Sequence, residues 1–289
     1  MTGTQHPDPQ HTHLSPETLA DLARIAADVA RVAGAKIQEL RATGVTVAAS
    51  KSSITDVVTA ADRAAEELVV AALRAARPDD AILGEEGAGV AGTSGITWVI
   101  DPIDGTVNYL YDLPVYAVSI AATVADPLAM ADGRRAVAGA VYAPRLDELY
   151  EAWEGGGARL GGEPIRISGK TELATSLVAT GFGYTVERRI EQAAMVSRLV
   201  PRARDIRRMG SAAYDLCALA AGRLDAYFER GLQPWDYAAG ALIAREAGAA
   251  LLGRDETTPP GEPLMFVADP ALVHELRDVV LGRDPDTRQ

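Results

Sequence analysis

Hydrophobic residues recur every three to four positions in several parts of the chain, a spacing that predicts amphipathic helices. The first helix is expected over residues 15–40, where a Ser-Pro pair supplies a capping residue and then a proline suited to the first helical position. A second is expected over residues 60–76 and ends before Pro78. The same spacing predicts later helices over residues 187–199, 211–221, 237–247 and 270–281.

Short apolar runs bounded by glycine, proline or charged residues predict β-strands. Two of them, residues 137–142 and 148–153, are expected to form a hairpin, and the glycines at 155–157 and 161–162 indicate turns after it. Helices and strands alternate in the second half, whereas the first half has longer β-runs, so we expect an α+β or α/β fold in which helices cover layered sheets. The other predicted strands cover residues 81–83, 96–100, 115–123, 177–180, 224–229, 249–252 and 264–268.

Composition limits the number of domains and the classes of function. The 289 residues, 48% of them hydrophobic, suit two domains with a sizeable core. We expect a disordered polar tail at 1–14, a metal- and phosphate-binding domain at 15–160 and a second domain at 161–289 that contributes Asp236. Lys and Arg total 28 against 40 Asp and Glu, and this net charge of −12 disfavours non-specific binding to nucleic acid or anionic membranes. The tail histidines are expected to be solvated rather than bound to metal, and they are His6, His11 and His13.

The sequence shows no segment that would direct the chain into or across a membrane. No run of 18 apolar residues occurs, and the N-terminus lacks the apolar core of a secretory signal, so we expect a cytoplasmic protein. The single cysteine, Cys217, excludes an intramolecular disulfide and a cysteine-based zinc cluster. Its apolar helical setting predicts a small buried hydrophobe.

The densest chemical signal is the segment 98–108, with the sequence WVIDPIDGTVN. An apolar strand delivers Asp101 and Asp104 at its C-terminal end, and two carboxylates on one tight turn repel each other unless a cation lies between them. Gly105 permits close backbone approach, and its N–H and that of Thr106 can face an anion. A plain Asp-rich turn is the alternative, and the length of the whole string disfavours it.

Other carboxylates have ordinary explanations when each is taken alone. Glu85 stands in GEEG after a short strand, which is typical of a solvated loop but also of ligand sites at strand ends. Asp236 could be a helix N-cap, and Glu229 a solvent-facing strand residue. The spacing of Asp62 from the preceding threonine is that of a capping box, which is sufficient to explain it.

All of these candidate metal ligands are carboxylate oxygens, without histidine or cysteine. Such hard donors at a strand end suit Mg²⁺ or Mn²⁺ rather than zinc or copper. Several carboxylates leave room for more than one ion, and two ions about 3.5–4 Å apart would clamp the oxygens of an in-line phosphoryl displacement.

The strings GEE at 84–86, WVIDPIDGTVN at 98–108 and WD at 235–236 together resemble the signatures of the inositol monophosphatase family of Mg²⁺-dependent, lithium-sensitive phosphatases. The resemblance covers about residues 18–280, and its later part is most similar to the bacterial SuhB-type branch, its actinobacterial members above all. It implies a layered αβαβα sandwich of the inositol monophosphatase/fructose-1,6-bisphosphatase type, and a homodimer. Val107 and Tyr109 differ from the residues that are commoner at these positions in the family, and neither is an expected metal ligand.

The resemblance also implies which residues bind metal. Glu85, Asp101 and the Ile103 carbonyl would hold a first Mg²⁺. Asp101, Asp104 and Asp236 would hold a second, and Glu85 would reach a weaker third ion through water. Mn²⁺ stays open as an alternative metal, and inhibition by Li⁺ is expected.

Catalytic and substrate-binding roles follow from the same resemblance. Gly105 and Thr106 would bind phosphate, Asp62 would pair with the Thr106 hydroxyl to orient the attacking water, and Glu85 would share in catalysis. Lys51 would lie in a mobile loop of the metal site. The implied substrate contacts are Ile103, Asp104, Gly105, Thr106, Arg207, Gly210, Ser211, Ala212, Glu229 and Asp236.

We expect a metal-activated water to attack phosphorus directly, without a phosphoenzyme. Glu229 offers an acceptor to ring hydroxyls, which favours myo-inositol 1-phosphate among small phosphorylated polyols. Histidinol phosphate or another sugar phosphate, fructose 1,6-bisphosphate, NADP and 3′-phosphoadenosine 5′-phosphate stay open as alternatives. A bisphosphate or nucleotide would need extra basic groups, and the sequence offers only Arg207 and Arg208 for that place.

The alternative to an enzyme is a binding protein that contacts the transcription machinery. SuhB-type proteins resemble factors that bind this machinery, and a basic segment could contact RNA or RNA polymerase. We favour a substrate-side arginine with solvated neighbours, and expect no membrane partner. The basic residues are Arg202, Arg204, Arg207 and Arg208.

Overall fold

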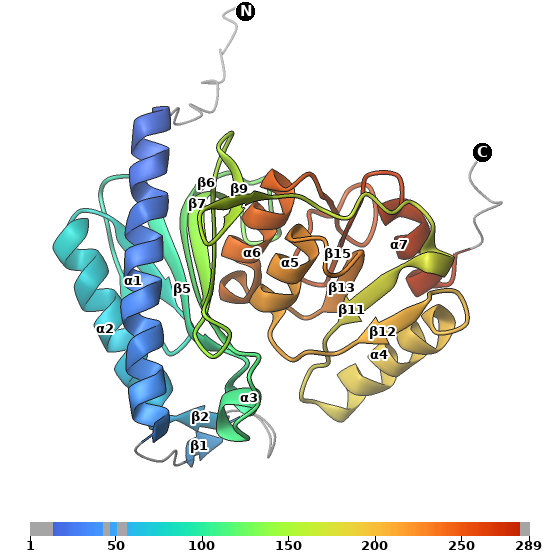
Figure 1. Ribbon diagram of the computed structural model, residues 1–289, viewed down its shortest axis with the longest axis horizontal. Helices are drawn as coiled ribbons and strands as arrows, with labels where there is room; N and C mark the ends of the chain where they lie inside the picture. Colours follow the sequence, from blue (N-terminus) through green and yellow to red (C-terminus); the bar gives the residue numbers. More distant parts are fainter. Residues whose placement is uncertain (1–13, 43–46, 51–56, 284–289) are drawn as a thin grey trace, which may run out of the picture.

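Five layers of helices and sheets make up the computed structural model, which describes residues 14–42, 47–50 and 57–283. Figure 1 shows a layer of helices, a large sheet, a central layer of helices, a smaller sheet and an outer layer of helices in that order across the molecule. The expected αβαβα sandwich is therefore confirmed. The tail histidines and Lys51 lie outside the described residues.

The first layer consists of α1 (Pro16–Ala42) and α2 (Ala60–Ala76). α1 begins where the sequence predicts, because the Ser15 hydroxyl accepts the Thr18 N–H at 3.2 Å and caps the first turn. One stripe of α1 packs on the large sheet, against β6 (Ala117–Ala125) and β7 (Arg134–Ala143). The most deeply buried residues of this stripe are Leu22, Ala23, Ala26, Ala30, Ala33 and Ile37.

The large sheet has eight strands in the order β10-β9-β8-β7-β6-β5-β3-β4. All neighbours are antiparallel except β3 and β5, which run parallel. The predicted hairpin of residues 137–142 and 148–153 is confirmed as part of β7 and β8. The remaining strands of this sheet are β3 (Ala81–Gly84), β4 (Gly89–Val90), β5 (Thr97–Asp104), β8 (Glu148–Trp153), β9 (Gly157–Leu160) and β10 (Glu163–Ile165).

The smaller sheet has the order β12-β11-β13-β15-β14. β11 pairs in parallel with β12 and β13, whereas β15 is antiparallel to both of its neighbours. Figure 1 shows α4 and α7 on its outer side. The strands are β11 (Leu177–Thr180), β12 (Asp205–Arg207), β13 (Ala226–Arg230), β14 (Ala250–Leu252) and β15 (Leu264–Ala268), and the outer helices are α4 (Val186–Leu199) and α7 (Val273–Leu281).

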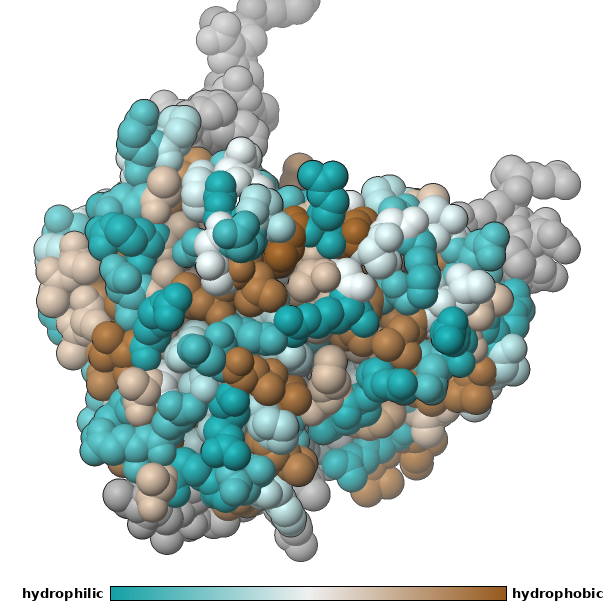
Figure 2. All heavy atoms as spheres, in the orientation of Figure 1, coloured by the Kyte–Doolittle hydropathy of each residue, from teal (hydrophilic) through white to brown (hydrophobic). Residues whose placement is uncertain are grey.

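The central helices α5 (Ala212–Ala220) and α6 (Pro234–Glu246) lie between the two sheets. A helix covered from both sides must be apolar around most of its circumference, and α5 has the sequence AAYDLCALA. Cys217 within it is fully buried, as expected from its apolar setting. Burial also raises the pKa of its thiol well above the usual value. On the face shown in Figure 2, by contrast, hydrophilic side chains are spread over both halves of the molecule, with hydrophobic groups between them.

Several short elements were not predicted. β1 (Val47–Ser50) and β2 (Val57–Thr59) pair antiparallel, and α3 (Thr106–Leu110) and a 3₁₀ turn (Leu173–Thr175) also form. None of them is long enough to show a hydrophobic period. β12, β9 and β10 were missed for the same reason. No helix of the described residues combines the length and apolarity needed to cross a membrane.

β5 is longer than predicted and carries both aspartates inside the strand. Its register against β6 shifts between Asp101 and Asp104, which accommodates Pro102 within the sheet. The expectation that the strand stops at residue 100 and that a tight turn after it carries both aspartates was therefore wrong. The irregularity matters because it sets the relative positions of the two carboxylates.

Candidate active site

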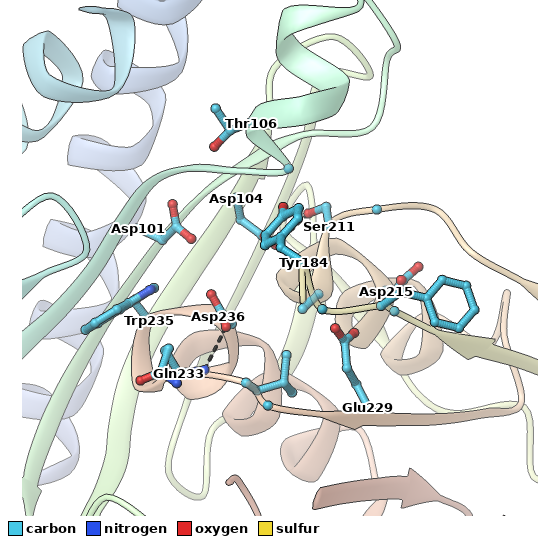
Figure 3. Close-up of a pocket in the computed structure, with 18 of the residues that line it drawn as sticks. Asp101, Asp104, Thr106, Tyr184, Ser211, Asp215, Glu229, Gln233, Trp235 and Asp236 are labelled. Carbon is cyan, nitrogen blue, oxygen red and sulfur yellow. Dashed lines mark hydrogen bonds between the residues drawn. The ribbon is translucent and has the colours of Figure 1, made fainter. Parts of the chain in front are cut away.

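Three aspartate carboxylates meet at one point between the two sheets. β5 supplies Asp101 and Asp104, and the first turn of α6 supplies Asp236, so that one oxygen of each lies within 4.8 Å of the others. Figure 3 shows the three side chains grouped around one space. Residues 135 positions apart in the sequence are thus brought together by the packing of α6 against the large sheet.

Local hydrogen bonds fix two of these carboxylates. The Ile103 N–H donates to Asp101 Oδ1 at 2.9 Å, and the Gln233 N–H donates to Asp236 Oδ2 at 2.7 Å. Gln233 is the N-cap of α6 and Asp236 is its third residue, so the interpretation of Asp236 as an N-cap was wrong. In each case the second oxygen stays available for another partner.

The third carboxylate, Asp104, is held by the other half of the molecule. The Ser211 hydroxyl and the Ala213 N–H both donate to Asp104 Oδ2 at 2.7 Å. Ser211 caps α5, so the end of β5 is joined to the N-terminus of a central helix.

Glu85 approaches the same space from β3. Its N–H donates to the Ile100 carbonyl at 3.3 Å, which keeps the residue beside β5. The turn that carries it is fixed by Glu66 of α2, whose carboxylate accepts the N–H groups of Glu86 and Ala88 at 2.9 and 3.0 Å. Glu85 therefore lines the cavity on a well-supported turn rather than on a solvated loop.

The cluster concentrates negative charge in a poorly solvated place. Burial raises the pKa of Asp101 well above its usual value, and Glu85 and Asp104 raise it further. Burial likewise raises the pKa of Asp104 to about 6, although its bonds from Ser211 and Ala213 act in the opposite direction. The pKa of Asp236 is also well above the ordinary one, because of burial and the charge of Asp104. A divalent cation would relieve this repulsion, and carboxylate oxygens are the donors that Mg²⁺ prefers.

The start of α3 lies beside these carboxylates. Gly105 caps it with φ of 93°, and a Cβ here would come within 3.0 Å of the Gly210 carbonyl, so glycine suits both the conformation and the close contact. The Thr106 hydroxyl lies 3.1 Å from the Ile103 carbonyl and 3.4 Å from Asp62 Oδ1. The first N–H groups of a helix lack helical partners, so this turn can face an anion.

A cavity of about 390 Å³ extends from the carboxylate cluster into the second half of the chain. Its size is in the usual range for a small-molecule site. Glu229 of β13 lies in it and accepts the Tyr227 hydroxyl at 2.8 Å, and burial raises the pKa of its carboxyl to about 7. The other sequence-predicted residues that line the cavity are Glu85, Asp101, Ile103, Asp104, Gly105, Thr106, Gly210, Ser211, Ala212 and Asp236.

Besides Asp62, which contacts the Thr106 hydroxyl, Arg207 is the described site candidate that does not line the cavity. It lies at the end of the edge strand β12, is about half exposed and pairs with Asp205 at 2.7 Å. It does not line the cavity, whereas its neighbour Arg208 does. Successive residues of an extended chain point to opposite sides, so a shift of one position decides which arginine faces the cavity.

Sequence reasoning missed several residues that line the cavity. Arg188 of α4 and Arg230 of β13 add positive charge, and no motif marked them. Asp215 also lines it, and is buried in α5. A signal for Asp215 did exist, because it is the single charged residue of an otherwise apolar helix.

Comparisons with known proteins agree with this geometry. The model of the family described as "Inositol monophosphatase family" matches residues 18–281. The chain is 47% identical to "Inositol-1-monophosphatase SuhB" of Mycobacterium tuberculosis over 236 residues, which is 78% of this chain and 79% of that protein. It is 41% identical to "Nus factor SuhB" of Escherichia coli over 229 residues, 78% of this chain and 83% of that one.

Solved structures give the same result. Mycobacterium tuberculosis SuhB superposes with a TM-score of 0.76 at 43% identity, covering 91% of this chain and 97% of that one. The extragenic suppressor protein suhB of Bartonella henselae superposes with a TM-score of 0.81 at 31% identity, covering 89% and 97%. The chain therefore belongs to the inositol monophosphatase family and is a phosphatase.

Proposed function

We propose that the chain hydrolyses small phosphorylated polyols with the help of Mg²⁺, and that myo-inositol 1-phosphate is its preferred substrate. The observation that carries this proposal is the meeting of three aspartates, Asp101, Asp104 and Asp236, beside the first turn of α3 in one cavity. The names of the mycobacterial relatives support the choice of substrate.

The donor set fits divalent cations. Asp101, Asp104, Asp236 and Glu85 would hold them, with the Ile103 carbonyl as a further oxygen donor. A cation bound there acts as a Lewis acid toward phosphate oxygens and lowers the pKa of the water that attacks. Binding of the cation would also reduce the charge repulsion among the carboxylates of the cluster.

The remaining groups position the reactants. The N–H groups of Gly105 and Thr106 would bind the phosphate oxygens, and Asp62 would hold the Thr106 hydroxyl so that it orients the attacking water. We assign the proton of this water to Asp62 or Glu85. No side chain needs to form a covalent intermediate, and the buried Cys217 takes no part.

Glu229 would bind the alcohol part of the substrate, together with the backbone at Gly210–Ala212. A carboxylate acceptor suits a substrate that is rich in hydroxyl donors. Three arginines also line the cavity, and they are Arg188, Arg208 and Arg230. The cavity therefore holds more positively charged side chains than the sequence predicted. Fructose 1,6-bisphosphate and nucleotide phosphates therefore belong in the same test.

The test is Mg²⁺-dependent phosphate release across a panel. The panel contains myo-inositol 1-phosphate, histidinol phosphate, fructose 1,6-bisphosphate, NADP and 3′-phosphoadenosine 5′-phosphate. The expected result is the highest kcat/KM for inositol 1-phosphate, lost in Asp104→Asn. A higher value for another compound would overturn the choice of substrate, and no release from any of them would overturn the hydrolase proposal.

Binding to the transcription machinery is a second candidate. Relatives named Nus factor SuhB favour it, as do the exposed arginines Arg202 and Arg204 beside Arg207. If it holds, the chain will co-purify with RNA polymerase, and Asp104→Asn will leave this association unchanged while charge reversal at Arg202 and Arg204 weakens it. Absence of polymerase from a pull-down with the intact chain would contradict it.

A further inference from the structure

We propose that Asp215 is a specificity-determining residue whose carboxylate accepts a hydrogen bond from a hydroxyl group of the substrate's alcohol part. This inference rests on the proposed polyol phosphatase activity and extends it to a residue for which neither the sequence motifs nor the family resemblance implied a role.

The first observation is a buried acceptor without a partner. Asp215 lies in the first turn of α5 and is 1% exposed. Its Oδ1 has no hydrogen-bond partner among the described residues. Leaving a buried polar oxygen unpaired costs about 1–3 kcal/mol, and more when the group is charged, so folded proteins seldom retain one without a use for it.

The second observation is where the residue lies. Asp215 lines the cavity that holds the aspartate cluster, and Figure 3 places it beside Glu229, farther along the pocket from Asp101. Its pKa is held well above the usual value, first by burial and then by the charges of Glu229 and Asp104, while Arg208 acts in the opposite direction. The carboxyl of Asp215 therefore interacts through charge with the part of the site where we propose that the alcohol part of the substrate binds.

The chemistry of this part of the site selects hydroxyl donors. Carboxyl oxygens accept hydrogen bonds in either protonation state, and Glu229 already receives one from Tyr227. A polyol that fills the cavity can donate to both Asp215 and Glu229. A compound of equal size without hydroxyls leaves both acceptors unpaired, and sites built to pair a substrate hydroxyl discriminate strongly against such analogues.

A purely structural role makes a different prediction. An acidic residue in the first turn of a helix interacts favourably with the helix dipole, and Asp215 satisfies this condition. Loss of that interaction would lower stability, and it would change the hydrolysis of every substrate to a similar extent. The two roles are therefore separated by comparing substrates rather than by activity alone.

The experiment compares myo-inositol 1-phosphate with cyclohexyl phosphate, which has a six-membered ring but no free hydroxyls. In Asp215→Asn, which keeps the size of the side chain, kcat/KM for the inositol ester should fall at least about tenfold, mainly through KM. The value for cyclohexyl phosphate should stay within about twofold. The wild-type chain should prefer the inositol ester. Asp215→Ser is a second variant, for use if the asparagine does not fold.

Asp225→Asn serves as the matched control, since Asp225 is also a buried aspartate of this half but pairs with Lys170 away from the cavity. It should leave the ratio between the two substrates unchanged. Equal losses on both esters in Asp215→Asn, or an unchanged ratio, would overturn the inference. So would a shift confined to the Mg²⁺ concentration that gives half-maximal rate, because that would make Asp215 a metal-site residue. If the wild-type chain does not prefer the inositol ester, the proposed function fails instead.

Discussion

The Ser211 hydroxyl donates a 2.7 Å hydrogen bond to Asp104 Oδ2, although 107 residues separate the two in the sequence. The same hydroxyl accepts the Tyr214 N–H at 3.3 Å as the N-cap of α5. One side chain therefore terminates a helix of the second half and orients a carboxylate of the first. The geometry of the proposed metal site depends on this contact between the halves.

We expect Ser211→Ala to lower both stability and activity. Loss of a cap costs about 1 kcal/mol, and Asp104 loses one of its hydrogen-bond donors, so kcat should fall about tenfold or more. Thermal unfolding and steady-state kinetics measure the two effects. Ser15→Ala is the matched control, because Ser15 caps α1 far from the cavity. Equal kinetic losses in both variants would contradict a specific role for Ser211.

Asp101→Asn should have opposite effects on stability and activity. Burial and the neighbouring carboxylates disfavour the ionised form of Asp101, so a neutral amide should raise the Tm in the presence of EDTA. The same change removes a proposed cation ligand, and Mg²⁺-dependent hydrolysis should fall about 100-fold or more. Mg²⁺ should then raise the Tm of the wild type more than that of the variant. A variant that loses stability in EDTA would argue against electrostatic repulsion in the cluster.

Asp225 gives a pH-dependent prediction away from the site. Burial alone would raise its pKa, but hydrogen bonds from Leu177, Ser168 and Lys170 outweigh burial and hold the pKa below the usual value. The folded state therefore prefers ionised Asp225, and its stabilising effect is present above the unfolded pKa of about 3.9 and lost as the pH falls through the lower folded value.

Asp225→Asn should accordingly reduce the free energy of unfolding by about 1–3 kcal/mol at pH 7. The difference from the wild type should shrink as the pH falls below about 4. Urea unfolding at several pH values measures it. A penalty that stays constant down to acidic pH would show that packing, rather than charge, is responsible.

Gly181→Ala should disturb Glu229 by crowding. A Cβ at this position would overlap Glu229 Oε2, so the carboxylate must move. We expect KM for inositol 1-phosphate to rise about tenfold, with a much smaller change for cyclohexyl phosphate. Gly89→Ala is the control, because a Cβ there meets no atom within 4 Å. The prediction fails if KM rises equally for both esters.

The parts of the fold that the sequence revealed are those with a long hydrophobic period. α2 begins at Ala60 and ends at Ala76 as predicted, since 17 residues give nearly five turns of apolar spacing and Pro78 stops the helix. β12 is only three residues long, and two of them are charged. A strand of this kind forms because β11 lies beside it, which is tertiary information.

The same distinction applies to the site. Asp101 and Asp104 stand in one string, so their proximity could be predicted locally. The position of Asp236 beside them followed only from the family resemblance, and the structure shows that packing of α6 produces it. Arg208 rather than Arg207 faces the cavity, and Asp215 lines it. Both placements depend on how the strand and the helix are oriented, and a shift of one residue along the chain would change which side chain faces the cavity.

The joining of β5 to α5 and α6 also has a consequence for biosynthesis. A ribosome adds residues in order, and Asp236 is added 132 residues after Asp104. Until α6 has emerged and packed on the first sheet, the nascent chain holds only two of the three clustered aspartates, although Ser211, which orients Asp104, precedes α6 in the chain. The proposed metal site therefore cannot be complete before α6 has been synthesised and has packed on the large sheet.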